Sequence, residues 1–377
     1  MPRVGGGALP GAMTHAPATP TLVVRGPDSL PALVPHLVGF HPEASLVLLG
    51  LAPERRTVRV TIRIDLPHPG DQVVDVVEAW SSSLAALPRS GALEAILVVY
   101  PGAADDPWRD GRPRELPFRD LVDELAAELK DAGLTALDAV CIVGDRLRSY
   151  WCGDQACCPE GGRPVDPEKV LRVRAALVGQ GSAPLGSRHD LVRALAERDP
   201  DDPVRAAVAA ARDVVTMRMP AGTERRVGHV VDMLKAYAAD QRNAVALTRL
   251  VVLVGWLCDA IRSRDLLLRA LTVDPDPEVV AAARTVLGEA VRCSSGPSVA
   301  PPSAALAVCC WVAGDGAAAR VAVERALDAD PSYSLAALVS AALDTGAPPW
   351  TWVAMMAEVS VAAILGDDGA EDLAPGA

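Results

Sequence analysis

The sequence predicts an α/β N-terminal domain, built on a mixed and mostly parallel sheet covered by helices, followed by an all-helical region. Up to about residue 165, short β-branched or apolar runs alternate with segments of helical period. Such alternation is typical of a sheet covered on both faces by crossover helices. From residue 166 onward, almost every apolar pattern repeats at the helical period. The change falls at a cysteine-rich turn, Ser149–Pro164, which we take as the boundary.

Five segments of the N-terminal domain have strand patterns. Ser45–Leu51 and Ala95–Tyr100 are dominated by apolar residues, which favours strands buried on both faces. Thr57–Leu66 alternates apolar and polar residues, so we expect it near an edge of the sheet with one polar face. Asp138–Gly144 is a further strand, and Leu147–Cys152 is expected to pair with it as a hairpin.

Three helices are expected between these strands. Leu30–Leu37 follows Ser29, which is a suitable N-cap. Val73–Leu87 is amphipathic, and Phe118–Ala132 ends at Gly133, a residue typical of helix C-termini. With the strands, these helices predict an α/β domain over about 21–165.

The remaining chain is expected to form a helical domain over about 166–365. It is preceded by a flexible leader at 1–20, in which Met13 is an alternative start to Met1, and it is followed by a disordered acidic tail at 366–377. A first helix should open at Pro167, and further helices should begin approximately at Arg188, Asp202, Thr223, Gln241, Arg262, Pro277, Pro302, Gly316, Ser332 and Pro348.

An internal echo suggests helical hairpins similar to tetratricopeptide repeats. Arg269–Pro275 matches Arg325–Pro331 at five of seven positions, and in both copies the Asp is expected to cap the next helix while the Pro opens it. Around the second copy, the small residues fit the tetratricopeptide register, but its large aromatic residues are missing. Any pair of helices joined at an Asp-Pro junction remains an alternative interpretation.

The composition limits the classes of function. Half of the residues are hydrophobic and 3% are aromatic, so the core must be built from Val, Leu, Ile and Ala. The formal net charge of −12 argues against a general nucleic-acid binder, which needs a basic surface to release counterions. We therefore expect no nucleic acid among the partners.

The sequence also predicts a cytoplasmic protein. The leader lacks a continuous apolar segment with a basic lead, so it does not resemble a signal peptide. The longest apolar run, Leu250–Cys258, is far shorter than the roughly 20 residues that a membrane helix needs. Because cytoplasmic thiols are normally reduced, the eight cysteines are not interpreted as a disulfide framework.

The cysteine-rich turn is the first candidate site. Cys152 and Cys157 have a spacing suited to one zinc knuckle, Cys158 is adjacent, and Cys141 on the preceding strand is a conceivable fourth ligand. A redox role for neighbouring thiols is a second interpretation, and it would require a lowered thiol pKa. A small structural turn packed on the sheet edge is the third, and no cofactor is required by it.

A second candidate lies just before the first buried strand. His41 could act as a general base and Ser45 as a hydrogen-bond donor, because loops at sheet ends often carry sites. Arg63 and Asp65 project from one face of the alternating strand and could grip a polar ligand. The structural alternatives are a tight helix-to-strand connection and a solvated pair of charges.

Several signatures of catalysis are missing from the sequence. It contains no Gly-x₄-Gly-Lys phosphate loop, no Gly-x-Gly-x-x-Gly, no Gly-x-Ser-x-Gly elbow and no His-Glu-x-x-His. Lysines are also scarce, with Lys130, Lys169 and Lys235 as the full set. An enzymatic role is therefore not favoured by any local motif.

Several separated segments together resemble one family. They are Leu37–Pro42, Ser45–Val47, Arg63–Pro67, Ser149–Cys152, Cys157–Pro159, Ser187–Arg188, Trp311–Asp315, Ala326–Leu327 and Asp330–Leu335. They are similar to the actinobacterial family called domain of unknown function 4192, over nearly the whole chain from about Thr21 to Ala347. The resemblance implies a bacterial cytoplasmic protein and carries no established site residues. Val38 and Ala44 depart from the residues that the family leads us to expect.

Two hypotheses about function remain. The first is a non-catalytic scaffold or regulator whose helical region binds a protein partner. The second is a small-molecule or metal-binding protein that uses the Cys152–Cys158 turn and the His41 loop.

Overall fold

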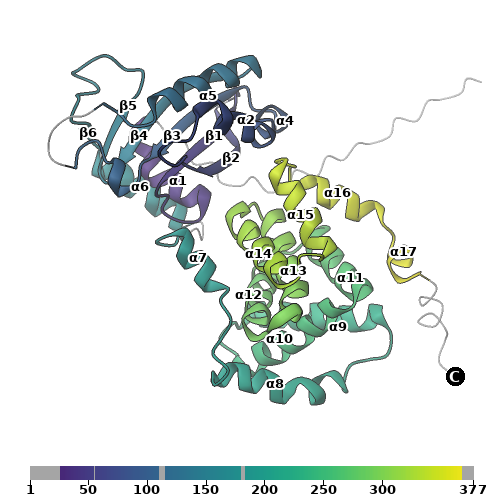
Figure 1. Cartoon of the computed structure of the whole chain (residues 1–377). Helices are drawn as coiled ribbons and strands as arrows, with labels where there is room; N and C mark the ends of the chain where they lie inside the picture. The colour runs from purple at the N-terminus through teal and green to yellow at the C-terminus, as the bar shows by residue number, and fades with distance from the viewer. Residues whose placement is uncertain (1–25, 55, 110–114, 180–182, 367–377) are drawn as a thin grey trace, which may run out of the picture.

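The computed structural model describes residues 26–54, 56–109, 115–179 and 183–366. Figure 1 shows an α/β domain beside a helical region, with helix α7 (Arg188–Ala194) running between them. The α/β class and the helical second part are thus confirmed. The predicted leader (1–20), with its two alternative starts, lies outside the described residues, as does the predicted tail (366–377) except for its first residue.

The α/β domain is built on one sheet of six strands in the order β2-β1-β3-β4-β5-β6. The strands are β1 (Ser45–Ala52), β2 (Thr57–Asp65), β3 (Glu94–Tyr100), β4 (Thr135–Val143), β5 (Arg146–Ser149) and β6 (Arg163–Pro164). Among these strands, β3 and β4 alone pair in parallel, so the prediction of a mostly parallel sheet is wrong. The reason is that β1–β2 and β4–β5 are joined by short turns, which permit antiparallel pairing alone.

The edge strand β2 changes faces at a β-bulge. The register against β1 shifts between Gly50 and Leu51, which leaves Arg59 as an extra residue. Val60 packs against the core on one face of the sheet, whereas Val58 packs against the core on the other. The predicted edge position is confirmed. The prediction that all apolar side chains of β2 share one face fails at the bulge. One inserted residue turns the following side chains to the opposite face of the sheet.

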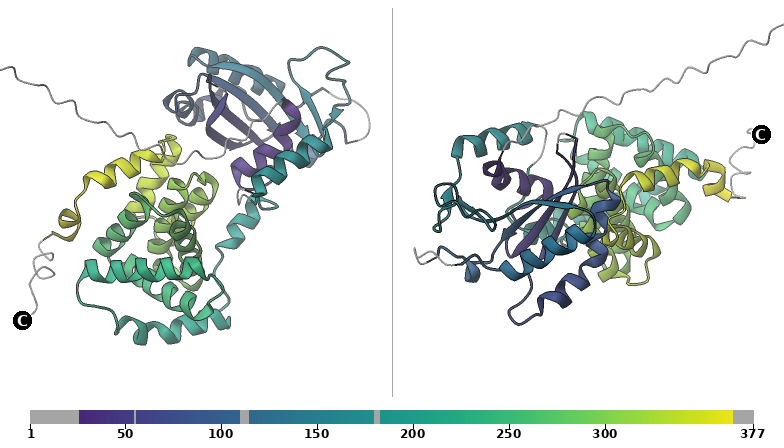
Figure 2. Two further views of the ribbon diagram at one scale, coloured as in Figure 1. Left: turned by 180° about the vertical axis from the view of Figure 1, so that it is seen from behind. Right: turned by 90° about the horizontal axis from the view of Figure 1, so that it is seen from above.

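Helices cover both faces of the sheet, as Figure 2 shows from two further directions. Helix α1 (Leu30–Val38) packs on one face, with α6 (Pro167–Gly179) beside it. On the opposite face lie α2 (Val73–Ala79) and α5 (Arg119–Asp131). The central strands are therefore covered on both faces, which explains why β1 is buried along its whole length.

The predicted helix over 73–87 is interrupted. The structure has α2, then the short helices α3 (Ser81–Leu84) and α4 (Ala86–Arg89). The breaks fall at Trp80 and Ala85, on either side of the serine-rich helix α3, and serine is a weak helix former because its side chain competes for backbone groups. Two 3₁₀ turns, η1 (Pro27–Ser29) and η2 (Ala103–Asp105), complete the described part of this domain.

The helical region surrounds one central helix. Its elements after α7 are α8 (Pro203–Thr216), α9 (Thr223–Ala239), α10 (Ala244–Asp259), α11 (Ile261–Thr272), α12 (Pro277–Cys293), η3 (Gly296–Val299), α13 (Ala300–Val312), α14 (Gly316–Ala329), α15 (Ser334–Asp344), α16 (Trp350–Glu358) and α17 (Val361–Leu365). Helix α13 is buried on nearly all sides. Its small and apolar residues suit a position that contacts neighbours all round.

The two echoed Asp-Pro junctions do not begin helices in the predicted way. Helix α12 is capped by Asp276, whose carboxylate accepts from the Glu278 amide, while Asp274 adopts a positive φ of 53° in the turn. Asp330 ends α14, and its carboxylate accepts from the Ser332 amide. Asp stabilises turns in the same way as it caps helices, which is why the sequence pattern does not separate the two.

Within the described residues, the two parts of the chain contact each other at several places, among them Gly39, which lies close to Asp315 and Ala317 of the helical region. Gly346 has a positive φ of 61°, and a Cβ there would lie 1.9 Å from the Cβ of Ala86. Beside it, Arg89 donates a hydrogen bond of 2.7 Å to the carbonyl of Thr345. At another place, Leu185 exchanges backbone hydrogen bonds with the loop that follows α1. The absence of a side chain at Gly346 is thus what permits the contact with Ala86.

None of the described helices is by itself long and apolar enough to cross a lipid bilayer. Helices α10 and α11 pass that test as a pair, but they are bent by 119° at the break between them. Much of both helices lies in the core of the helical region.

Candidate functional site

The cysteine-rich segment forms a loop between β5 and β6. The end of the loop that leads into β6 is held to the rest of the domain by several contacts. Arg146 donates a hydrogen bond of 2.7 Å to the carbonyl of Gly161. The indole of Trp108 donates to the carbonyl of Glu160 at 3.0 Å. The same indole fills the space that a side chain at Gly162 would need, because a Cβ there would lie 2.6 Å from the ring. The loop is therefore held by both backbone and side-chain contacts.

A serine at the end of β5 positions the first cysteine. The hydroxyl of Ser149 donates to the carboxylate of Asp138 on the neighbouring strand at 2.6 Å. The same oxygen accepts from the amides of Trp151 and Cys152, both at 3.2 Å. Since Ser149 is itself buried, this network fixes the direction in which the chain leaves the sheet.

A turn at Asp154 brings the two later cysteines back toward the first. The carboxylate of Asp154 accepts from the amide of Ala156 at 2.9 Å. Its carbonyl accepts from the amides of Cys157 and Cys158 at 3.1 and 2.7 Å. Asp is favoured in such a turn because its side chain bonds to the backbone two residues later.

The three thiols of the loop, Cys152, Cys157 and Cys158, converge and form what we call the thiol cluster. Their sulfur atoms all lie within 4.8 Å of one another, and those of Cys157 and Cys158 are 3.9 Å apart. Cys157 is exposed, Cys152 is half-buried and Cys158 is buried. Burial, together with the neighbouring thiols, raises the pKa of Cys158 from 9.0 to about 11.

Cys141, the conceivable fourth ligand, lies apart from the thiol cluster. It is fully buried on β4, in the core beneath α5. Its thiol contacts the hydroxyl of Tyr150, which donates to the carbonyl of Pro117 at 2.7 Å. Burial raises the pKa of Cys141 to about 12. In the part of the chain that the structure describes, no fourth His, Cys, Asp or Glu joins the three thiols.

The second candidate site is brought together in part. The guanidinium of Arg63 donates through Nε to the hydroxyl of Ser45 at 2.9 Å and pairs with Asp65. The hydroxyl of Ser45 donates to the carbonyl of Glu43 at 2.6 Å. His41 is exposed on the adjacent loop, held by its amide rather than by its ring. The Ser45 hydroxyl therefore donates its proton to a backbone carbonyl, which cannot act as a general base.

A tyrosine that the sequence analysis did not single out lies next to this group. Tyr100 is directly opposite Ser45 in the pairing of β1 and β3, and it is 9% exposed. Its hydroxyl has no hydrogen-bond partner among the described residues. Burial accordingly raises the pKa of Tyr100.

The family of the chain can now be given. The model of the family described as Domain of unknown function (DUF4192) matches residues 27–350, a range that includes the sheet, the thiol loop and the helices up to the start of α16. The chain belongs to this family. No curated protein and no solved structure shows a significant match to this family member. The site must therefore be interpreted from its own geometry.

The residues that organise the thiol cluster were missed by the sequence analysis. Asp154 had a visible signal, because Asp between Gly and Gln inside a Cys-flanked loop is typical of a turn. Ser149 and Asp138 had none, since they meet across two strands 11 residues apart. Chemically, the arrangement offers three soft sulfur ligands on a fixed loop, one of them exposed, which is suited to a thiophilic metal ion.

Proposed function

We propose that this protein binds a zinc ion through the thiolates of Cys152, Cys157 and Cys158. The observation that carries the proposal is the convergence of three sulfur atoms within 4.8 Å. Two thiolates bound to one tetrahedral zinc ion, each at about 2.3 Å, are about 3.8 Å apart. The sulfurs of Cys157 and Cys158 are 3.9 Å apart, which agrees with this separation.

Three protein ligands leave one position of a tetrahedral zinc ion open. Zinc sites that activate water or bind a substrate share this arrangement, whereas structural sites have four protein ligands. Cys157 is exposed, so the open position is accessible to solvent. We assign the fourth position to water.

Zinc binding at neutral pH must displace protons from the thiols. The pKa of Cys158 is raised to about 11, principally by burial, so this thiol is protonated in the metal-free protein. Because the ligand is the thiolate, each proton released couples affinity to pH. We expect the zinc affinity to rise with pH through the neutral range.

A redox role is less well supported. Nucleophilic redox thiols have a lowered pKa, whereas that of Cys158 is raised by burial. The adjacent pair Cys157–Cys158 is also poorly placed for a disulfide. Its trans peptide sets the Cα atoms about 3.8 Å apart, below the usual disulfide range of about 4.4–6.8 Å. A disulfide between Cys152 and either Cys157 or Cys158 is the remaining redox interpretation.

Elemental analysis tests the zinc proposal directly. Full-length protein purified without a chelator should contain about one zinc ion per chain. The variant Cys157→Ser should lose most of this zinc, while Cys293→Ser, a half-buried thiol on α12, should retain it. After replacement of zinc by Co²⁺, the thiolate-to-cobalt absorption should weaken in Cys157→Ser alone. Wild-type protein without zinc, or equal zinc content in the wild type and both variants, would contradict the proposal.

A second candidate function is the binding of a protein partner by the helical region. The observation that favours it is a set of large apolar side chains exposed on its last long helices. Trp350 is 67% exposed, Leu338 54% and Met355 44%. Exposed aromatic and Met side chains are enriched where proteins bind one another. A tetratricopeptide-like arrangement of the hairpins is part of this candidate.

The partner-binding candidate is tested by paired substitutions. A bound protein should be lost from the Trp350→Glu variant and retained by Met217→Glu. Met217 is 78% exposed and lies in the connection between α8 and α9 of the same region. Both variants should remain folded, because neither side chain is in the core. If no protein distinguishes the two variants and light scattering shows a monomer, this candidate is excluded.

A further inference from the structure

The helical region contains a cavity that is independent of the thiol cluster. It lies between α7, α12, α13 and α14 and has a volume of about 370 Å³. Its walls include Leu191 from α7, Leu195 just after the end of α7, Gly288 from α12 and Leu306 from α13. Pockets that hold small molecules are mostly apolar and have volumes of roughly 300–1,000 Å³. The cavity falls at the lower end of that range.

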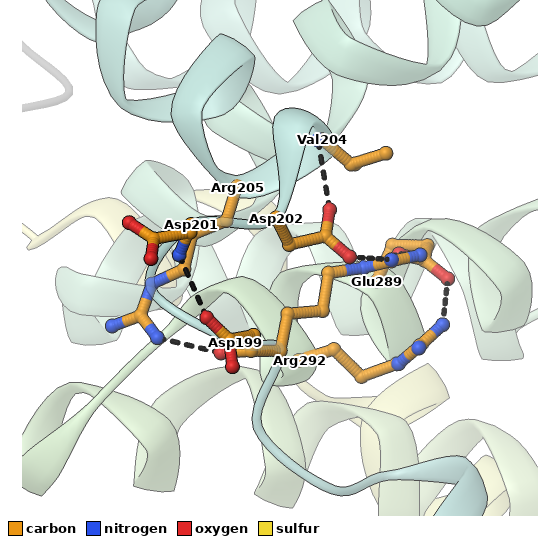
Figure 3. A network of polar contacts seen from close by, with 8 residues as sticks. Asp199, Asp201, Asp202, Val204, Arg205, Glu289 and Arg292 are labelled. Atoms are coloured by element: carbon orange, nitrogen blue, oxygen red, sulfur yellow. Dashed lines mark hydrogen bonds and ion pairs between the residues drawn. The ribbon is translucent and has the colours of Figure 1, made fainter.

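Helix α7, which forms one wall, is fixed close to both of its ends. At its start, Arg188 donates to both carboxylate oxygens of Glu324 at 2.7 and 2.5 Å. Just after its end, Arg198 donates to Glu289 on α12 at 2.8 and 2.9 Å and to Asp202 at 2.8 Å. Figure 3 shows the second group, in which Glu289 also accepts from a neighbouring arginine of α12. The cavity is therefore a preorganised space and not a loose gap.

The absence of a side chain at Gly288 helps to keep the cavity open. A Cβ at this position would meet one atom within 4 Å, Cδ2 of Leu195, at 3.8 Å. This is an ordinary contact, so a larger residue would extend into the cavity without a backbone clash.

One charged group lines this mostly apolar space, which also includes Thr285, whose hydroxyl donates to the carbonyl of Ala281 at 3.2 Å. Arg284 lines the cavity, and its guanidinium pairs with the carboxylate of Asp315 and contacts the thiol of Cys310. Asp315 offsets the charge of Arg284, and it also caps α14 by accepting from the Ala318 amide at 3.1 Å. A guanidinium has five N–H donors, more than these partners use. The cavity thus offers hydrogen-bond donors without a net positive charge.

We infer that this cavity binds a small neutral molecule with an apolar body and a carbonyl oxygen, such as a ketone, ester or amide. The apolar body would lie against Leu191, Leu195 and Leu306, and the carbonyl oxygen would accept a hydrogen bond from Arg284. A neutral acceptor fits better than a carboxylate, because an anion would add an uncompensated charge beside Asp315 in a chain of net charge −12.

Calorimetric titration of the full-length protein with 2-octanone, and separately with octanoate, tests this inference. We expect saturable one-site binding of 2-octanone and weaker binding of octanoate. The variant Gly288→Leu fills the cavity and should weaken 2-octanone binding by about tenfold or more. Arg284→Met removes the donors and should weaken it by about tenfold.

The matched control is Gly228→Leu, the same substitution at an exposed position inside α9 with no atom near its Cβ. It should bind 2-octanone as the wild-type protein does. Melting curves of Gly288→Leu should show a folded protein, so a loss of binding reports on the cavity. Absence of saturable heat with 2-octanone, or unchanged binding in Gly288→Leu, would overturn the inference. Tighter binding of octanoate would overturn the choice of a neutral ligand.

Discussion

Arg188, at the first position of α7, donates two hydrogen bonds to the carboxylate of Glu324 on α14. The two residues are 136 positions apart in the sequence. Both bonds come from one guanidinium nitrogen, Nη2, and such charge-assisted hydrogen bonds are shorter and stronger than neutral ones. Because α7 has no buried residue of its own, this pair is a principal anchor of the helix that links the two parts of the chain.

Alanine at position 188 should loosen α7 without much effect on global stability. The two side chains are 38% and 42% exposed, so their coupling in a double-mutant cycle with Glu324→Ala should be below about 1 kcal/mol. Hydrogen exchange should accelerate in α7 and not in α13. Arg193→Ala, which removes a 70% exposed arginine from the same helix, is the control. Equal exchange in both variants would contradict the anchoring role.

The contact of Gly346 with Ala86 predicts a specific cost for a single methyl group. Gly346→Ala should destabilise the protein by the strain of a positive φ plus about 1–3 kcal/mol for the clash with Ala86. Gly91→Ala is matched, because Gly91 also has a positive φ but has no atom within 4 Å of its Cβ position. Urea unfolding of both variants should place Gly346→Ala clearly below Gly91→Ala. Similar stabilities would mean that the two parts separate readily at this contact.

A buried hydrogen bond should tie α16 to α11. The indole of Trp352 donates to the hydroxyl of Thr272 at 3.1 Å, and both residues are buried. Thr272→Val keeps the shape but leaves the indole N–H without its acceptor, so it should cost about 1–3 kcal/mol in chemical unfolding. The loss should shrink in a Trp352→Phe background. Thr248→Val, whose hydroxyl bonds only to the Ala244 carbonyl, should cost less.

Stability should fall in alkaline solution because buried thiols must stay protonated. Burial raises the pKa of Cys258 from 9.0 to about 12. A group whose pKa is higher in the folded state contributes stability that is complete below pH 9 and lost as the pH rises toward 12. The unfolding free energy of Cys258→Ala should therefore decline less steeply over this window than that of the wild type. Parallel declines in the two proteins would contradict this effect of Cys258.

Individual strands show which features of the fold sequence patterns can predict. Ser45–Ala52 and Glu94–Tyr100 are strands close to the predicted ranges, because a run of apolar residues between turn residues has few other solutions. The same patterns say nothing about which strands are neighbours or in which direction they pair. The parallel prediction failed there, since the β4–β5 hairpin and the β1–β2 turn decide direction through loop length.

For the candidate sites, spacing along the chain was informative only within one loop. Cys152, Cys157 and Cys158 are close in sequence, so one turn at Asp154 suffices to bring them together. Cys141 is close in sequence as well, but β4 directs it into the core beneath α5. Alternation of side chains along a strand decides such a case, and a shift of one residue would reverse it.

The sequence alone predicts an α/β domain followed by helices, because apolar periodicity and turn residues determine secondary structure locally. It also places three thiols in one loop. The antiparallel pairing, the separation of Cys141 from that loop, and the cavity beneath α7 with Arg284 in its wall were decided by tertiary structure. Each of these features depends on contacts between segments that are far apart in the chain. Such contacts leave no local sequence pattern from which they could be predicted.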